Sequence, residues 1–350
     1  FVRSAQWESL TNELKKNRIL FHQAVIDGEP TPAMVDGITQ KFRNDRIDVV
    51  AAIGGGSVLD GGKAVSAMLP MKKPVIDYLE GVGTLPYDGN KLPFIAVPTT
   101  AGTGSEATKN AVISQTGKNG FKKSLRHERL IPDIAVVDPE LTLSCPASVT
   151  SACGMDALTQ LIESLVSTQA SAITDSLASG ALTVLGESII PAATTSPDDI
   201  DLRSRISYAS YVSGLTLANA GLGLVHGLAG TLGGFFDIPH GVACGTLLAE
   251  TTRQNVDALI RTDPDGIALR KYASAASLLD PSGTGGSAKH DVRRLVSLLE
   301  HWSDALDMPR LGEYGITGED VERITAAAGQ KNNPAVLPAE KVRRIIENRL

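Results

Sequence analysis

The stretch GMDALTQLIES places two polar side chains where a single helix could present both of them to a ligand. Asp156 and Gln160 are four residues apart, and this spacing puts them on the same face of a helix. A carboxylate and a histidine at such spacing often hold one metal ion, but the second position here is glutamine. Three interpretations remain open: a metal site, a former metal site, or a polar patch on a helix.

Two histidines further along the chain bear on this choice. His226 in GLGLVHGLAG and His240 in FDIPHG both have uncharged neighbours. A single histidine in such surroundings is more often a hydrogen-bonded core residue than a ligand. Two of them, downstream of a helix that carries a carboxylate, favour a divalent metal held by Asp156, His226 and His240.

Two glycine-rich turns follow strand-like segments and could bind phosphate groups. The first is Gly54-Gly55-Gly56-Ser57, and the second lies in PTTAGTGSEAT at 98–108. Glycines let the backbone approach a ligand closely, and free N–H groups at a helix start bind anions. Either turn alone could be a tight turn without a ligand. As a pair at the carboxyl ends of two strands, they favour a dinucleotide.

The first turn matches neither of two common nucleotide-binding fingerprints. A Walker A loop would need glycine at Ser57 and a hydroxyl residue at Ala64, and a GxGxxG motif would need glycine at Leu59. A P-loop kinase or ATPase is therefore disfavoured.

The elements that must position these residues differ between the two halves of the chain. Strand-like runs lie at 18–26, 47–53, 93–98 and 134–138. They alternate with helical patterns, which predicts a parallel sheet with helices on its faces. Further along, helical patterns lie at 151–168, 171–187, 201–220, 222–235, 253–277, 289–305 and 318–328. We expect an α/β dinucleotide-binding domain at 1–142 and an all-helical metal and substrate domain at 143–350.

Composition excludes several classes of protein. The 350 residues are 42% hydrophobic and 21% charged, with a net charge of −6 and no basic stripe that would point to nucleic acid. Cys145, Cys153 and Cys244 have the spacing of neither a disulfide framework nor a zinc knuckle. We expect a cytoplasmic protein without a signal peptide. The run 206–236 lacks Asp, Glu, Lys and Arg, but its glycines favour buried helices over a membrane span.

Taken together, the motifs resemble the iron-containing alcohol dehydrogenases, also called group III alcohol dehydrogenases. The matching segments run in the family's order: GGGSVLDGGKA (54–64), PTTAGTGSE (98–106), IPDIAVVDPELT (131–142), GMDALTQ (154–160), GLGLVHGLAGTLGGFFDIPHG (221–241) and NNP (332–334). The resemblance implies a Rossmann-like N-terminal domain and a helical C-terminal domain in a dehydroquinate synthase-like architecture. It also implies NAD or NADP, a divalent metal such as Fe²⁺ or Zn²⁺, a homodimer, and interconversion of an alcohol with its aldehyde or ketone.

The resemblance assigns roles to individual residues. The pyrophosphate would lie against Gly54, Gly55, Gly56, Ser57 and Asp60, and the rest of the cofactor against Thr99, Thr100, Thr103, Asn110 and Lys122. Asp156, His226 and His240 match metal ligands, Gln160 stands at the fourth ligand position, and His226 and His240 are the expected catalytic residues. In the family's reaction the metal polarises the substrate oxygen while hydride passes to or from the nicotinamide.

Three departures from the family pattern modify these expectations. Gln160 replaces a histidine, and its neutral amide oxygen is a weaker donor, so we expect a weak or water-bridged fourth ligand. Gly230 replaces a further active-site histidine, which predicts a roomier substrate pocket. The chain also begins at the helix that should follow the first strand. We therefore expect the first strand–turn unit, where NAD and NADP would be distinguished, to be missing.

Other functions remain open beside a metal-dependent dehydrogenase. The segment LGGFFDIPH also resembles maleylacetate reductase, a metal-free relative. A lyase similar to dehydroquinate synthase is disfavoured because the basic residues that a phosphorylated sugar acid needs are lacking. A nucleotide-binding sensor with a decayed metal site is the non-catalytic alternative. In none of these do we expect a nucleic-acid or membrane partner.

Overall fold

The structure is a computed structural model that describes residues 4–283 and 287–350. Its strands are β1 (Val50–Gly54), β2 (Phe94–Pro98), β3 (Asn110–Gln115), β4 (Phe121–Arg126) and β5 (Ile134–Ala135). Its α-helices are α1 (Ala5–Lys16), α2 (Pro32–Phe42), α3 (Gly56–Met68), α4 (Ala147–Val166), α5 (Ala172–Gly186), α6 (Ile189–Ala193), α7 (Ile200–Ala220), α8 (Leu224–Phe235), α9 (His240–Thr262), α10 (Ile267–Leu279), α11 (Ala288–Ala305), α12 (Val321–Ala327) and α13 (Ala339–Glu347). A sheet-containing part followed by helices confirms the predicted fold class.

The central sheet is parallel, with the strand order β1-β2-β5. Val50 is opposite Phe94 and Gly54 is opposite Pro98, so β1 and β2 end at the same edge of the sheet. Phe94, Ala52 and Ala96 form a small core with Leu59 of α3, which holds that helix against the sheet. This packing fixes the direction in which the turn between β1 and α3 points.

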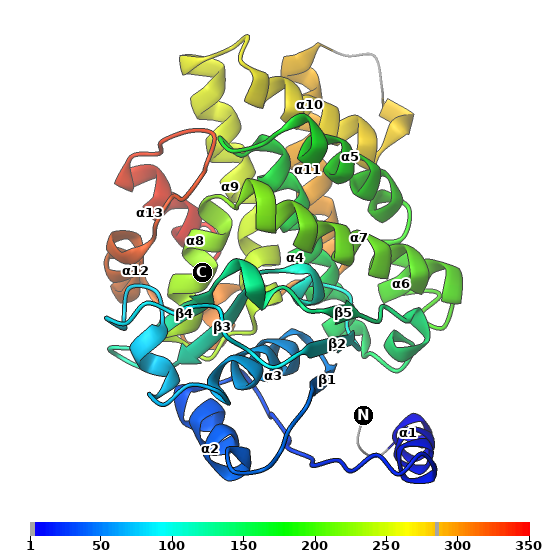
Figure 1. Cartoon of the computed structure of the whole chain (residues 1–350). Helices are drawn as coiled ribbons and strands as arrows, with labels where there is room; N and C mark the ends of the chain where they lie inside the picture. The colour runs from blue at the N-terminus through cyan, green and yellow to red at the C-terminus, as the bar shows by residue number, and fades with distance from the viewer. Residues whose placement is uncertain (1–3, 284–286) are drawn as a thin grey trace.

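Strands β3 and β4 form a separate antiparallel hairpin that the sequence patterns did not predict. Ile113 of β3 and Leu125 of β4 are fully buried and join a second core with residues of α3. The hairpin lies between the sheet and the helical part, where β4 packs against α8 (Figure 1).

Two predicted elements are wrong. No strand forms at 18–26, where Leu20 is 95% exposed and residues 19–27 have no regular structure. Apolar, β-branched composition does not make a strand when no neighbouring strand takes up the backbone hydrogen bonds. The helix predicted at 253–277 is in fact the end of α9 and all but the last turn of α10. Proline and glycine in the intervening DPDG turn separate the two helices.

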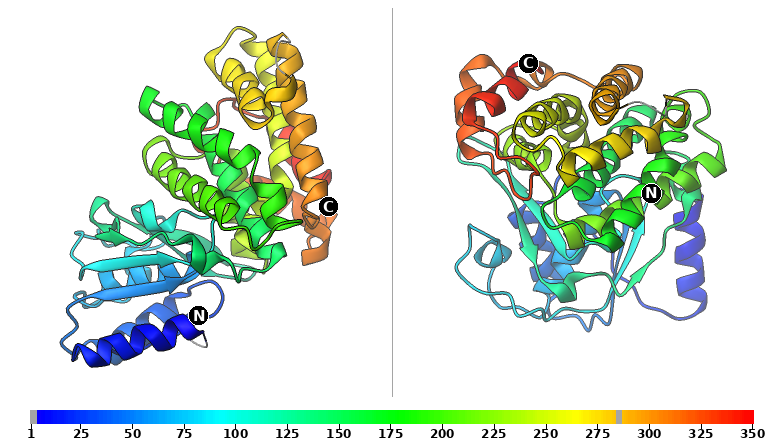
Figure 2. Two further views of the ribbon diagram at one scale, coloured as in Figure 1. Left: turned by 90° about the vertical axis from the view of Figure 1, so that its right-hand side faces the viewer. Right: turned by 90° about the horizontal axis from the view of Figure 1, so that it is seen from above.

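The helices from α4 onward enclose the largest hydrophobic core of the described residues. In Figure 1 and in the left view of Figure 2, the sheet and α1–α3 lie at the lower end, and α5, α7, α9, α10 and α11 lie above them. Helix α4 packs against α5, α7 and α9, so most of its residues are buried. Its position between the sheet and the upper helices places its polar residues at the junction of the two parts.

The uncharged run at 206–236 forms most of α7 and all of α8. Among the described residues, no single helix has both the length and the apolar composition needed to cross a membrane. Helices α7 and α8 meet those criteria only when taken together, and the chain bends by 100° between them.

Candidate active and metal site

Helix α4 presents three polar side chains on one face. Asp156, Gln160 and Glu163 are 1%, 2% and 5% exposed, respectively. Their spacing of four and then three residues brings them into line along the helix. Burial of carboxylate and amide groups costs free energy unless each finds a polar partner, so their contacts define what the site can do.

Glu163 holds His226 of α8 in a fixed orientation. Its Oε2 lies 2.7 Å from His226 Nδ1, and its Oε1 accepts a hydrogen bond of 2.7 Å from the backbone N–H of Val225. The Nε2 atom of His226 lies on the other side of the ring, 3.3 Å from Asp156 Oδ1. Such a carboxylate–histidine pair is typical of metal-binding histidines because it fixes the ring tautomer. Glu163 was not among the predicted residues, although its spacing from Asp156 is a usable signal.

Helix α9 begins at His240 and places Cys244 one turn further on. His240 Nε2 lies 3.9 Å from Asp156 Oδ1. Cys244 Sγ lies 3.7 Å from His226 Nε2 and 3.8 Å from His240 Nε2. One ligand atom from each of these four residues lies within 4.8 Å of the others. We call Asp156, His226, His240 and Cys244 the Asp156 cluster.

The Asp156 cluster has the donors and the electrostatics of a divalent cation site. Asp156 Oδ1 is buried and has no hydrogen-bond partner among the described residues. Burial raises the pKa of Asp156, but His240 and His226 outweigh this effect and lower it to about 2. Burial lowers the pKa of His240 to about 3, against the opposing effect of Asp156. A carboxylate, imidazoles and a thiol gathered in one buried place form a donor set that fits a divalent metal.

Cys244 was not predicted as part of the site. The pattern at 253–277 put the helix start thirteen residues too late, so His240 and Cys244 were not recognised as neighbours on one helical face. Their spacing of four residues is the signal that the sequence offered. Burial raises the pKa of the Cys244 thiol to about 12, while His226 opposes that rise.

Gln160 has partners away from the Asp156 cluster. Its Oε1 accepts a hydrogen bond from Ser213 Oγ of α7 at 2.8 Å, and its Nε2 donates to the backbone oxygen of Thr103 at 3.4 Å. The amide therefore connects the helical part to the second glycine-rich turn. The role of Gln160 as a weak metal ligand remains a prediction.

The two glycine-rich turns lie against each other where β1 and β2 end. A Cβ atom on Gly56 would lie 2.5 Å from the Thr103 side chain, so only glycine allows this approach, whereas one on Gly55 would make an ordinary contact of 3.4 Å with Thr100. The backbone N–H of Thr99 donates to the oxygen of Gly54 at 2.9 Å. Helix α3 starts after Gly55 without a side-chain cap, which leaves the N–H groups of its first turn available to an anion.

Asp60 and Lys63 of α3 hold that helix against the second glycine-rich turn. Asp60 accepts hydrogen bonds from Ser105 Oγ and from the backbone N–H of Val112, the latter at 3.0 Å. Lys63 Nζ donates to the backbone oxygens of Ser105 and Asn110, both at 2.8 Å, and lies 3.8 Å from Asp60. Burial lowers the pKa of Lys63 to about 8, and Asp60 opposes that change. Lys63 was not among the predicted site residues.

Asn110 and Lys122 lie on the β3–β4 hairpin. Asn110 Oδ1 is buried and has no hydrogen-bond partner within the described part of the chain. Lys122 Nζ forms a 3.0 Å ion pair with Glu29, and its side chain lies 3.0 Å from where a Cβ on Gly233 would stand. The hairpin packs against α8, which carries His226, and after burial the positive charge of Lys122 also lowers the pKa of His240.

Gly230 lies one turn after His226 on α8. A Cβ atom on Gly230 would meet no heavy atom within 4 Å. The position therefore borders open space, where a larger side chain would have room.

Comparisons with known proteins match both the α/β part and the helical part of the chain to one family of enzymes. Residues 1–139 match the family model of iron-containing alcohol dehydrogenase, and residues 150–350 match that of the C-terminal part of the Fe-containing alcohol dehydrogenase family. The NAD-dependent methanol dehydrogenase of Bacillus methanolicus is 32% identical over 92% of this chain and 82% of its own length. The long-chain-alcohol dehydrogenase 1 of Geobacillus thermodenitrificans is 33% identical over 97% of this chain and 85% of its own.

Two solved structures have the same fold over nearly the whole chain. A crystal structure of 1,3-propanediol oxidoreductase has a TM-score of 0.86 and 27% identity, covering 99% of this chain and 89% of that one. The sulfoacetaldehyde reductase from Bifidobacterium kashiwanohense in complex with NAD⁺ has a TM-score of 0.80 and 26% identity, covering 98% and 89%.

Proposed function

The chain belongs to the iron-containing alcohol dehydrogenase family, and from this premise we propose how its residues divide the work of the reaction. The protein is an NAD(P)-dependent oxidoreductase that interconverts an alcohol and an aldehyde or ketone by hydride transfer. The observation that carries the proposal is the convergence of Asp156, His226 and His240 beside the glycine-rich turns.

Asp156, His226 and His240 would hold the divalent metal, Fe²⁺ or Zn²⁺. When bound, that ion supplies positive charge that polarises the substrate oxygen. Asp156 provides negative charge in a buried place, and the two histidines provide nitrogen donors. Glu163 fixes the ring of His226 through Nδ1, so that Nε2 faces Asp156, with which it would hold the ion. His226 and His240 thus act at the reacting centre as ligands.

The glycine-rich turns would hold the cofactor. The uncapped N–H groups at the start of α3, around Gly54, Gly55, Gly56 and Ser57, suit the pyrophosphate. Thr99, Thr100 and Thr103 line the adjoining turn, and the unpartnered Oδ1 of Asn110 offers an acceptor beside it. Lys122 supplies positive charge near His240. Asp60 would act by fixing the second turn, because both of its oxygens already accept hydrogen bonds from the protein.

The main test is a steady-state assay of NADH and NADPH absorbance with a panel of alcohols and aldehydes. The assay is run on untreated protein, on chelated protein, and after Zn²⁺ or Fe²⁺ is returned, with metal content measured by elemental analysis. We expect activity to fall on chelation and to recover with metal. Undiminished activity without retained metal would contradict the metal site and favour an enzyme similar to maleylacetate reductase. Cofactor binding without turnover would contradict the enzymatic function.

The open space at Gly230 supports a substrate larger than ethanol. In Gly230→His, we expect kcat/KM for long-chain or acidic aldehydes to fall at least about tenfold relative to that for acetaldehyde, because the added ring fills the pocket. Gly37→His is the matched control, since Gly37 is also a helical glycine with no atom near its Cβ position, but in α2. Better turnover of ethanol than of larger alcohols by the unmodified protein would overturn this substrate class.

We further propose a cytoplasmic homodimer that acts on small molecules and has no nucleic-acid or membrane partner. The net charge of −6 and the three free cysteines support this environment. The exposed apolar side chains of Ile19, Leu20 and Val25 support contact with a second copy of the chain. Light scattering checks the assembly, and a monomeric mass near 36.7 kDa would contradict it.

A further inference from the structure

We infer that Cys244, as a thiolate, is the fourth protein ligand of the metal, in the place that the sequence pattern gives to Gln160. This inference rests on the metal site of the proposed function and adds a ligand of different chemistry to it. The observations that carry it are the convergence of four ligand atoms in the Asp156 cluster and the engagement of Gln160 elsewhere.

The distances within the Asp156 cluster are close to the edges of a metal-centred tetrahedron. Bonds of about 2.0–2.1 Å to nitrogen or oxygen and about 2.3 Å to sulfur would separate sulfur from nitrogen by about 3.6 Å, and oxygen from nitrogen by about 3.3 Å. Cys244 Sγ lies 3.7 and 3.8 Å from the Nε2 atoms of His226 and His240. Asp156 Oδ1 lies 3.3 Å from His226 Nε2 and 3.9 Å from that of His240.

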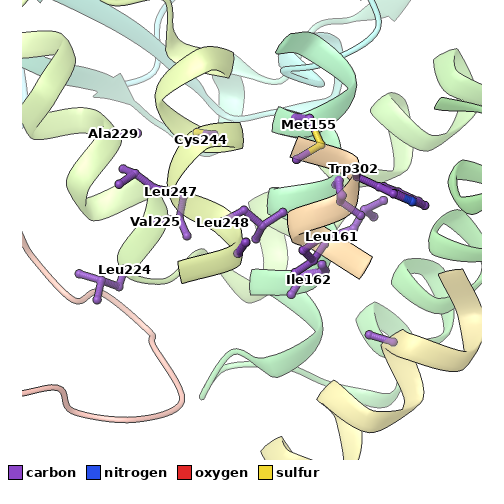
Figure 3. Packing of buried hydrophobic residues seen from close by; sticks show 14 of the residues in the cluster. Met155, Leu161, Ile162, Leu224, Val225, Ala229, Cys244, Leu247, Leu248 and Trp302 are labelled. Carbon is purple, nitrogen blue, oxygen red and sulfur yellow. The ribbon is translucent and has the colours of Figure 1, made fainter. Parts of the chain in front are cut away.

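The surroundings of Cys244 distinguish it from an ordinary core cysteine. A buried cysteine usually behaves as a small hydrophobic residue. Figure 3 shows Cys244 on α9, between labelled residues of α8 and Met155 of α4, where it is fully buried. Its sulfur nevertheless lies near two imidazole nitrogens, and α9 carries His240 and Cys244 on one face. Hydrophobic packing alone does not explain why the sulfur of Cys244 lies near the ring nitrogens of both histidines.

Gln160 cannot act as the fourth ligand without losing its hydrogen bonds to Ser213 and Thr103. Its amide oxygen is the acceptor for Ser213 Oγ, and its amide nitrogen donates to the backbone of the turn at Thr103. A rotation of the amide toward the metal would break both of these hydrogen bonds, although Ser213 Oγ would keep its 2.7 Å hydrogen bond to the backbone oxygen of Ser210.

A thiolate ligand also changes the chemistry of the site. Cys244 would add an anionic sulfur ligand to the carboxylate of Asp156, whereas the amide of Gln160 is neutral. Sulfur is a softer donor than nitrogen or oxygen, and it favours Zn²⁺ over Fe²⁺. The assigned ligand set therefore makes zinc the preferred metal of this chain.

Cobalt substitution tests the inference because a cobalt–thiolate bond has its own absorption band. In the full chain loaded with Co²⁺, we expect a sulfur-to-cobalt charge-transfer band in the near ultraviolet. Cys244→Ser should lose the band and bind Zn²⁺ at least about 100-fold more weakly, since even residues that only support ligands change affinity 10–100-fold. The preference for Zn²⁺ over Fe²⁺ should also decrease. Cys145→Ser is the matched control, and Gln160→Leu should keep the band and its zinc affinity within about threefold.

The outcomes separate this inference from the proposed function. If the band persists in Cys244→Ser, or if Gln160→Leu loses zinc as strongly as Cys244→Ser does, the assignment of Cys244 is wrong and the metal site stands. If the unmodified protein retains neither cobalt nor zinc, both the assignment and the metal site are wrong. Should Cys244→Ser not fold, as judged by circular dichroism, zinc-edge X-ray absorption of the unmodified protein decides. Sulfur at about 2.3 Å supports the assignment, and nitrogen and oxygen ligands alone overturn it.

Discussion

Two buried polar clusters differ in how completely their polar atoms are paired within the protein. In the Lys63 cluster, formed by Lys63, Asp60, Ser105, Thr108 and Asn110, the ammonium group lies within 2.8–3.2 Å of five acceptor atoms. In the Asp156 cluster, by contrast, a carboxylate, two imidazoles and a sulfur converge, and Asp156 Oδ1 has no hydrogen-bond partner among the described residues.

This difference separates a structural cluster from a functional one. A buried network whose donors and acceptors are paired stabilises the fold, whereas a buried carboxylate oxygen without a hydrogen-bond partner suits a ligand from outside. The Lys63 cluster binds α3 to the second turn and so shapes the cofactor site. The Asp156 cluster is arranged for a ligand that the chain does not itself contain. Substitutions in the two clusters should therefore affect different measured quantities.

The largest effect is expected on stability, from Lys63→Met. The substitution leaves the backbone oxygens of Ser105 and Asn110 without their donor and Asp60 without its neighbouring charge. We expect the free energy of unfolding, measured with urea, to fall by about 3–5 kcal/mol. The exposed Lys72→Met is the control and should stay within about 0.5 kcal/mol. A loss below about 1 kcal/mol in Lys63→Met would show that the cluster does not hold the fold.

Asp156→Asn should have the next largest effect, and it should be on function. The amide keeps the shape of the carboxylate but removes its charge from the ligand set. We expect zinc affinity, measured by calorimetry, and kcat/KM each to fall at least about 100-fold, or about 2.7 kcal/mol. The loss of unfolding free energy should be smaller than in Lys63→Met. Unchanged zinc affinity would place the metal elsewhere and remove the contrast between the clusters.

The smallest effect is expected from Glu163→Gln, which acts through His226. The amide can still accept from the N–H of Val225 but no longer presents a negative charge to Nδ1. We expect zinc affinity to fall about 10–100-fold. Nitrogen NMR of the histidine side chains should show a changed tautomer at His226. An unchanged tautomer with full affinity would mean that Glu163 only caps α8 and does not orient the ligand.

The features of the fold that the sequence predicted correctly depend on residues close together in the chain. The glycines of 54–56 and the strand before them belong to one local unit, so the turn and the start of α3 follow from their order. Asp156, His226 and His240 are predicted ligands because Asp156 lies on a helix face with Gln160, two histidines in uncharged segments follow it, and all three match ligand positions of the family. Their convergence in the structure agrees with that identification.

The features that were missed depend on local boundaries and on distant packing. The hairpin β3–β4 was not predicted because its second strand, FKKSLR, is rich in lysine and has no clear alternation of apolar and polar residues. The start of α9 at His240 was missed because a proline and a glycine flank that histidine and resemble a loop. Because this helix start was missed, Cys244 was not recognised as a neighbour of His240. The two residues share a helical face only if the helix begins at His240.

The amino-acid sequence was sufficient to locate the two glycine-rich turns and the strand–helix alternation of the α/β part, and it predicts Asp156, His226 and His240 as metal ligands. Backbone conformation and the spacing of side chains on one helix are local properties, so they can be inferred without a fold. Only the tertiary structure decided which atoms meet: Glu163 at His226, Gln160 at Ser213, and Cys244 beside both histidines. These contacts depend on how α4, α7, α8 and α9 pack, because a displacement of a few ångströms between helices determines which side chain joins the Asp156 cluster.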